Sequence, residues 1–74
     1  MIIVATIENS KIVRSIALDE KVENAVDKAL VKCDLAALDI KPNQTVAMFQ
    51  DGRLLRFIDG KTKKWKFTNN SMYF

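Results

Sequence analysis

The first eighteen residues follow a strand-like pattern that predicts a β-hairpin. Residues 2–8 form a β-branched run, and residues 11–18 resume the pattern after the turn residues Asn9 and Ser10. Both alternating sets of side chains in the first run are apolar, which is typical of a central strand covered on both faces. The two sets are Ile3, Ala5 and Ile7 on one side and Ile2 and Val4 on the other.

Apolar residues at three- and four-residue spacing then predict one amphipathic helix of about four turns. Asp19 fits the N-cap because its carboxylate can accept a bond from a first-turn N–H group. The pattern continues irregularly through residues 35–38, and Pro42 excludes further helix. The predicted buried stripe contains Val22, Ala25, Val26, Ala29, Leu30 and Cys33, opposite Glu20, Lys21, Asn24, Asp27 and Lys28.

The last third of the chain predicts a β-meander. Asp-Gly pairs at 51–52 and 59–60 separate apolar-rich runs at 45–50, 53–58 and 61–68. The chain is therefore predicted to form one α+β domain over residues 1–74, in the order β-β-α-β-β-β, with the helix packed on a largely antiparallel sheet. This element order resembles that of the ubiquitin-like β-grasp fold. The resemblance concerns element order alone, since the chain ends in Ser71-Met72-Tyr73-Phe74 and not in Gly-Gly.

Register arguments predict which side chains of the meander face outward. A two-residue turn at Asp51-Gly52 pairs Phe49 with Leu54, Met48 with Leu55, Ala47 with Arg56 and Val46 with Phe57. A three-residue second turn with Gly60 left-handed directs Lys64 and Lys66 away from the helix, which avoids burying two charges. Trp65 and Phe67 then join the core side. The predicted outer face carries Phe49, Leu54, Arg56, Lys64 and Lys66, with Lys63 on the core-side rim.

The residue inventory argues against catalysis and against bound cofactors or metals. The 74 residues contain no His and a single Cys, so the commonest general base and the usual zinc ligands are missing. Cys33 lies on the apolar stripe and is interpreted as a buried structural thiol. An active site of Lys, Asp and Thr alone is the minor alternative. The sequence shows no membrane span and no signal-peptide pattern, which predicts a cytoplasmic protein.

Charge is unevenly distributed along the chain. Residues 1–40 carry five basic and seven acidic residues (−2), and residues 41–74 carry seven basic and two acidic residues (+5), which gives the net +3. Residues 61–67 interleave lysines with Trp65 and Phe67. One interpretation is nucleic-acid binding, in which the cations neutralise phosphates and an aromatic ring stacks on a base. The other is an edge strand protected by lysines, with both aromatic rings in the core.

Together these features favour a small non-enzymatic binding module that occupies a protein partner. Inhibitors, adaptors and accessory proteins work in this way, including those encoded by viruses and mobile elements. Nucleic-acid binding through the basic meander is the alternative, and an exposed strand edge also supports a homodimer. Met72, Tyr73 and Phe74 are assigned either to the core or to a docking tail. The candidate partner-binding residues are Arg56, Lys63, Lys64, Lys66, Phe49 and Leu54.

Overall fold

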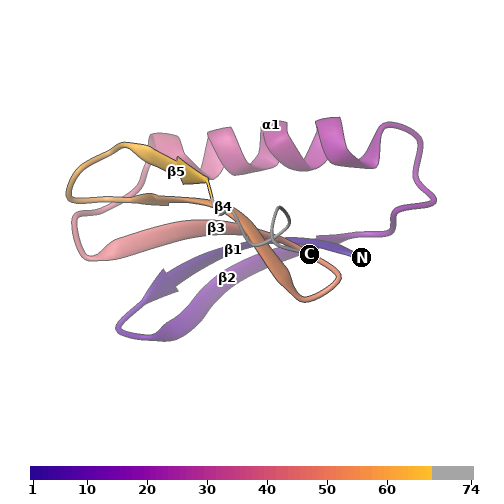
Figure 1. The fold of residues 1–74 in the computed structure, drawn as a ribbon. Coiled ribbons are helices and arrows are strands. Elements are labelled where there is room, and N and C mark those ends of the chain that lie inside the picture. Colours follow the sequence, from indigo (N-terminus) through magenta and orange to yellow (C-terminus); the bar gives the residue numbers. More distant parts are fainter. Residues whose placement is uncertain (68–74) are drawn as a thin grey trace.

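The computed structural model describes residues 1–67, which form a five-stranded sheet with a helix packed across one face (Figure 1). Strands follow the order β2-β1-β3-β4-β5, and every neighbouring pair is antiparallel. The predicted α+β class and element order are confirmed. The resemblance to the β-grasp fold remains one of element order. The elements are β1 (Ile2–Glu8), β2 (Lys11–Leu18), α1 (Ala25–Leu38), β3 (Gln44–Gln50), β4 (Arg53–Asp59) and β5 (Trp65–Phe67).

The helix begins later than the sequence predicts. Asp19 does not cap it, because the Asp19 carboxylate instead accepts a bond from the Lys21 N–H at 2.9 Å and closes a local turn. Asn24 directly precedes α1 in a left-handed conformation (φ 57°) and makes no side-chain cap bond. The helix then runs regularly to Leu38, so residues 35–38 are helical, and the chain reaches Pro42 just beyond it.

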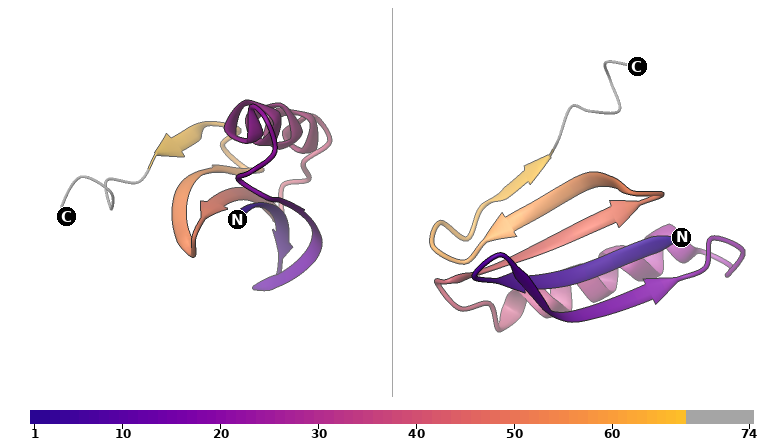
Figure 2. Two further views of the ribbon diagram at one scale, coloured as in Figure 1. Left: turned by 90° about the vertical axis from the view of Figure 1, so that its right-hand side faces the viewer. Right: turned by 90° about the horizontal axis from the view of Figure 1, so that it is seen from below.

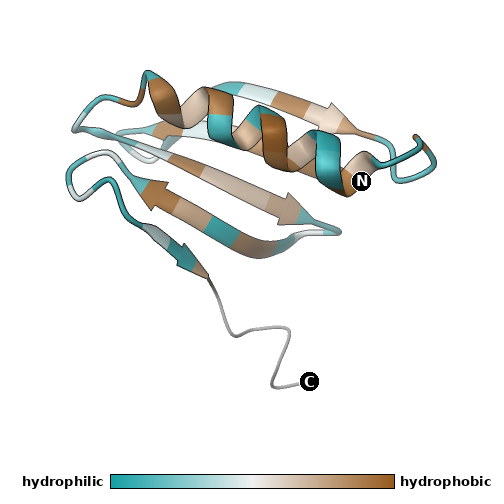
Figure 3. Ribbon diagram, turned by 90° about the horizontal axis from the view of Figure 1, so that it is seen from above, coloured by the Kyte–Doolittle hydropathy of each residue, from teal (hydrophilic) through white to brown (hydrophobic). Residues whose placement is uncertain are grey.

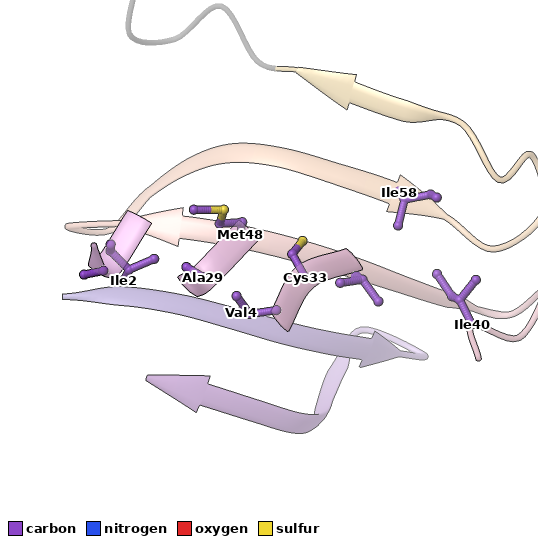
Figure 4. Close-up of a cluster of buried hydrophobic side chains, with 9 residues drawn as sticks. Ile2, Val4, Ala29, Cys33, Ile40, Met48 and Ile58 are labelled. Atoms are coloured by element: carbon purple, nitrogen blue, oxygen red, sulfur yellow. The ribbon is translucent and has the colours of Figure 1, made fainter. Parts of the chain in front are cut away.

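The hydrophobic core lies between α1 and one face of the sheet (Figure 4). Small residues on the inner side of the helix, Ala25, Ala29 and Cys33, let α1 lie close to the sheet. Large buried side chains such as Ile2 and Met48 fill the space beneath, and each contributes about 1.5–3 kcal/mol by leaving water. The sheet and loop residues of the core are Ile2, Val4, Ile40, Val46, Met48 and Ile58.

The outer side of α1 is less polar than an amphipathic helix requires. Val31, Leu35 and Leu38 are 56%, 53% and 77% exposed. Val22 and Val26, which the spacing assigned to the buried stripe, are also exposed. Viewed from the helix side, α1 accordingly alternates hydrophobic and hydrophilic segments (Figure 3).

The register between β3 and β4 differs from the predicted one. Phe49 pairs with Leu54 as expected, but a β-bulge follows and Met48 then pairs with Arg56. Leu55 is the extra residue of this bulge, and a one-residue shift moves every later side chain to the opposite face. Arg56 and Ile58 therefore lie on the helix side of β4, and Phe57 lies on the opposite side.

The connection between β4 and β5 is longer than the predicted three-residue turn. Ile58 pairs with Trp65, so residues 60–64 form the connection and β5 is only three residues long. Lys63, and not Gly60, takes a left-handed conformation here (φ 54°). Gly60 instead donates its N–H to the Gln44 carbonyl at 2.9 Å, which ties this connection to the start of β3.

Candidate binding surface

The face of the sheet opposite α1 is not covered by any helix or strand of residues 1–67 (Figure 2). We call this face the open face. Because cross-strand partners share a face, the strand pairing identifies the residues that lie on it. In the left view of Figure 2, the backbones of β2 and β4 curve away from α1, so the sheet arches toward the side opposite the helix. It carries Ile3, Ala5, Ile7, Ile12, Ser15, Ala17, Thr45, Ala47, Phe49, Leu54, Phe57, Asp59 and Lys66.

The centre of the open face is a floor of small residues. Ala5 and Ala47 pair with each other and are 0% and 2% exposed, because their larger neighbours shield them. Phe57 continues this row on β4, and Lys66 follows it on β5. The surrounding large apolar side chains are half-buried and retain surface for a partner: Ile3, Ile7, Phe49, Leu54 and Phe57.

This arrangement corrects the interpretation of β1 as a strand covered on both faces. Its position in the sheet is central, as predicted, but only the set of Ile2 and Val4 packs beneath α1. The other set, Ile3, Ala5 and Ile7, lies on the open face. A contiguous apolar surface of this kind is unusual on an isolated domain, so the open face is the candidate interaction surface of the described residues.

The structure brings together part of the predicted site. Phe49, Leu54 and Lys66 share the open face, and Lys66 points away from the helix side as expected. Lys63 and Lys64 are exposed on the connection that precedes β5. We call Lys63, Lys64 and Lys66 together the basic margin, of which Lys66 lies on the open face itself. The unbroken register predicted from the sequence places Phe57 on the core side, because no residue pattern signals the bulge at Leu55.

Arg56 lies on the helix side of the sheet, so its predicted place on the outer face is wrong. Its guanidinium stacks 3.8 Å from the centroid of the Trp65 ring and 5.5 Å from that of Phe67. It also lies 3.5 Å from the Asp34 carboxylate, and its side chain is 15% exposed. Nε is buried and has no hydrogen-bond partner in the described part of the chain. Arg56 therefore links β4, β5 and α1.

Trp65 and Phe67 share the helix side with Arg56, but to different depths. Trp65 is half-buried and packs against the core, as the sequence predicts. Phe67 is 69% exposed, so its assignment to the core is wrong. Phe67 is the last residue of this three-residue strand, and the Arg56 guanidinium 5.5 Å from its ring leaves most of the side chain exposed.

The remaining candidate groups in residues 1–67 are the Cys33 thiol and the acidic side chains. Cys33 is fully buried in the core, as predicted, and burial raises the pKa of its thiol, which keeps it protonated. Within residues 1–67, no three His, Cys, Asp or Glu side chains gather closely enough to hold a metal ion. No helix among the same residues is long and apolar enough to span a membrane.

Comparison of the chain with known protein families matched no family model, and comparisons with curated proteins and with solved structures gave no match. The geometry of the open face therefore carries the functional argument. The roles assigned to Met72, Tyr73 and Phe74 concern residues outside the described range.

Proposed function

We propose that the protein is a non-enzymatic binding module that holds a protein partner on its open face. The observation that carries this proposal is an apolar sheet surface, centred on Ala5 and Ala47, that no element of residues 1–67 covers. A second layer packed on such a surface removes apolar area from water, at roughly 25 cal/mol per Å². A partner protein supplies that second layer.

The surface also restricts the chemistry of the partner. Phe49, Leu54 and Phe57 cluster on the β3–β4 side and fit apolar side chains. Ala5 and Ala47 beside them are shielded by these larger side chains, which would therefore make the contact with the partner. The basic margin lies next to this cluster, so acidic residues on the partner would face Lys64 and Lys66. The expected partner surface is an apolar ridge flanked by carboxylates, whose charges speed association and fix orientation.

The test compares binding by variants that differ only in which face loses an aromatic ring. Phe57→Ser removes a ring from the open face, and Phe67→Ser removes an exposed ring from the helix side as a matched control. The partner is first isolated with the unaltered protein, and its affinity for each variant is then measured by calorimetry. The affinity should fall at least tenfold for Phe57→Ser and change little for Phe67→Ser. Equal losses, or a loss for Phe67→Ser alone, would reject the open face as the binding site.

Nucleic-acid binding is the second candidate function, and one observation favours it. Phe49 and Phe57 lie on the same sheet face as Lys66, and Phe57 pairs directly with Lys66. Half-exposed rings beside cations can stack on unpaired bases while lysines contact phosphates. This arrangement predicts binding to single strands in preference to duplexes, with affinity that falls steeply as salt rises.

Fluorescence anisotropy with labelled single- and double-stranded DNA and RNA separates the two functions. Micromolar binding that weakens with salt, is lost in Lys64→Glu/Lys66→Glu and falls in Phe57→Ser would support the nucleic-acid function. No binding at about 50 mM salt would eliminate it, because counterion release is strongest there. The lysine substitutions should reduce a protein contact only modestly, since charges at the rim of an interface chiefly affect association rate.

A further inference from the structure

Within residues 1–67, the outer edge of β2 is the longer of the two free edges of the sheet. β2 is the terminal strand, and seven of its eight residues are exposed. Its apolar side chains include Ile12, Val13 and Ile16, which are 62%, 55% and 40% exposed. No described strand pairs with its outer side, so a row of main-chain donors and acceptors is available there.

The two edges of the sheet are protected to different degrees. β5 has three residues, follows Lys63 and Lys64 and contains Lys66, and lysines are common devices against strand pairing. The first half of β2 has such devices too, with Lys11, Arg14 and a bulge at Val13. The second half, residues 15–18, reads Ser-Ile-Ala-Leu and has neither charge nor bulge. The edge is therefore open to another strand along residues 15–18, with Arg14 at the border of this stretch.

Charge along β2 is arranged so that the strand complements its own reversed copy. Lys11 and Arg14 lie toward its start, and Asp19 and Glu20 follow its end directly. In an antiparallel pair centred on Ile16, Arg14 of each copy lies diagonally next to Asp19 of the other, so these opposite charges meet at both ends, whereas Lys11 lies opposite Lys21. A parallel pairing would place like charges side by side.

We propose that β2 pairs with β2 of a second copy of this chain, antiparallel and centred on Ile16. This register sets Ile16 against its own counterpart, Ser15 against Ala17 and Arg14 against Leu18, with Asp19 and Glu20 of the other copy just beyond. All of these pairs lie after the bulge at Val13. The two sheets join into one of ten strands, with both helices on one side and both open faces on the other.

The dimer is expected to be reversible. α1 packs on β1 and β3 and makes few contacts with β2, so the contact is limited to the strand edge and its side chains. Such a contact buries less than the roughly 800 Å² per partner of a standard interface, which places it among transient associations. We therefore expect a dissociation constant on the order of 10–100 µM, which is weaker binding than in most stable complexes.

Sedimentation equilibrium tests the proposal. Protein concentrations from about 5 to 500 µM bracket the dissociation constant expected for a weak interface of this kind. The mass should rise from 8.4 kDa toward twice that value. Ile16→Lys places two ammonium groups across the two-fold axis and should weaken dimerisation at least tenfold. Val31→Lys, an equally drastic change at an exposed site on α1, should leave it unchanged. Circular dichroism of both variants checks that each is folded.

Charge reversal gives a second, independent test. Arg14→Glu alone should weaken the dimer, as should Asp19→Lys alone, whereas an equimolar mixture of the two should recover association by forming a mixed dimer. A single species of 8.4 kDa throughout the concentration range would overturn the proposal. So would a dimer insensitive to Ile16→Lys, because it would have to form through another surface.

Discussion

Replacing Gly60 by alanine tests the packing between the end of β4 and the α1–β3 connection. A Cβ at Gly60 would lie 1.9 Å from the Lys41 carbonyl oxygen, 2.8 Å from the Lys41 carbonyl carbon and 3.0 Å from the Gln44 oxygen. All three atoms belong to the backbone, so a side-chain rotation cannot relieve the contact. The two segments must separate by about an ångström, because Cβ contacts below 3.0 Å essentially never occur.

The cost of this separation follows from the contacts at risk. The Gly60 N–H to Gln44 bond and the Gln44 N–H to Lys41 bond are both 2.9 Å long and would stretch together. Each is worth about 0.5–1.5 kcal/mol, and displacing the neighbouring core residues Ile40 and Ile58 adds to the loss. We expect Gly60→Ala to lower the free energy of unfolding by about 3 kcal/mol, a large part of the roughly 4–11 kcal/mol typical of a chain this long.

Gly52→Ala is the matched control, because Gly52 has open space around its Cα and only its conformation (φ 80°) disfavours alanine. This substitution should cost about 1–2 kcal/mol, the usual penalty for a side chain in the left-handed region. Urea denaturation followed by tryptophan fluorescence measures both losses, and thermal melting should show them at roughly 4–8 °C per kcal/mol. If Gly60→Ala costs no more than Gly52→Ala, the close approach of the two backbones is wrong.

Three further predictions concern the buried arginine, the thiol and the amino terminus. Arg56→Ala should lower the free energy of unfolding by about 1–3 kcal/mol through loss of the stack on Trp65, whereas Arg56→Met keeps the aliphatic packing and should cost less in urea denaturation. The Cys33 thiol should react with a disulfide reagent only at the rate of unfolding, because it is fully buried and its pKa is raised; rapid labelling of the native protein would contradict this burial. Hydrogen bonds to Glu20 and Asp51 raise the pKa of the Met1 ammonium above 8.0, so its contribution to stability is present below pH 8 and is lost as pH rises through the raised pKa. N-terminal acetylation should remove this part of the alkaline decline in melting temperature, and the part due to Cys33, whose pKa is raised too, should remain.

The sequence predicts those elements that depend on local chemistry. The bounds of β1 and β2 follow from β-branched runs around Asn9 and Ser10, and both turn residues take the left-handed conformation that such turns need. The Asp51-Gly52 turn is correct for the same reason. The predicted start of α1 is wrong, because the Asp19 carboxylate can either cap a helix or close a local turn. The turn forms, with the Lys21 N–H as donor.

The candidate site was only partly predictable because it depends on contacts between distant segments. Asp59-Gly60 reads as a second tight turn, but Gly60 is needed where β4 meets the Lys41–Gln44 turn, and periodicity cannot reveal that contact. The uncovered apolar set of β1 was visible in the sequence. It was assigned to a covered face, because an alternation pattern reports which side chains are apolar and not what covers them.

The bulge at Leu55 links the buried arginine to the apolar open face. In an unbroken ladder, Arg56 would lie on the open face and Phe57 beneath the helix. The bulge exchanges them: Ile58 becomes 5% exposed, Leu55 still packs on the core, and the guanidinium of Arg56 is stacked on Trp65 with its Nε buried. Burying a guanidinium is unfavourable for stability, while an aromatic ring on the open face adds nothing to the core. A buried guanidinium and an outward aromatic ring both depart from the usual sorting of polar and apolar side chains. Such departures are expected at functional sites, and here they produce an apolar surface beside a basic margin.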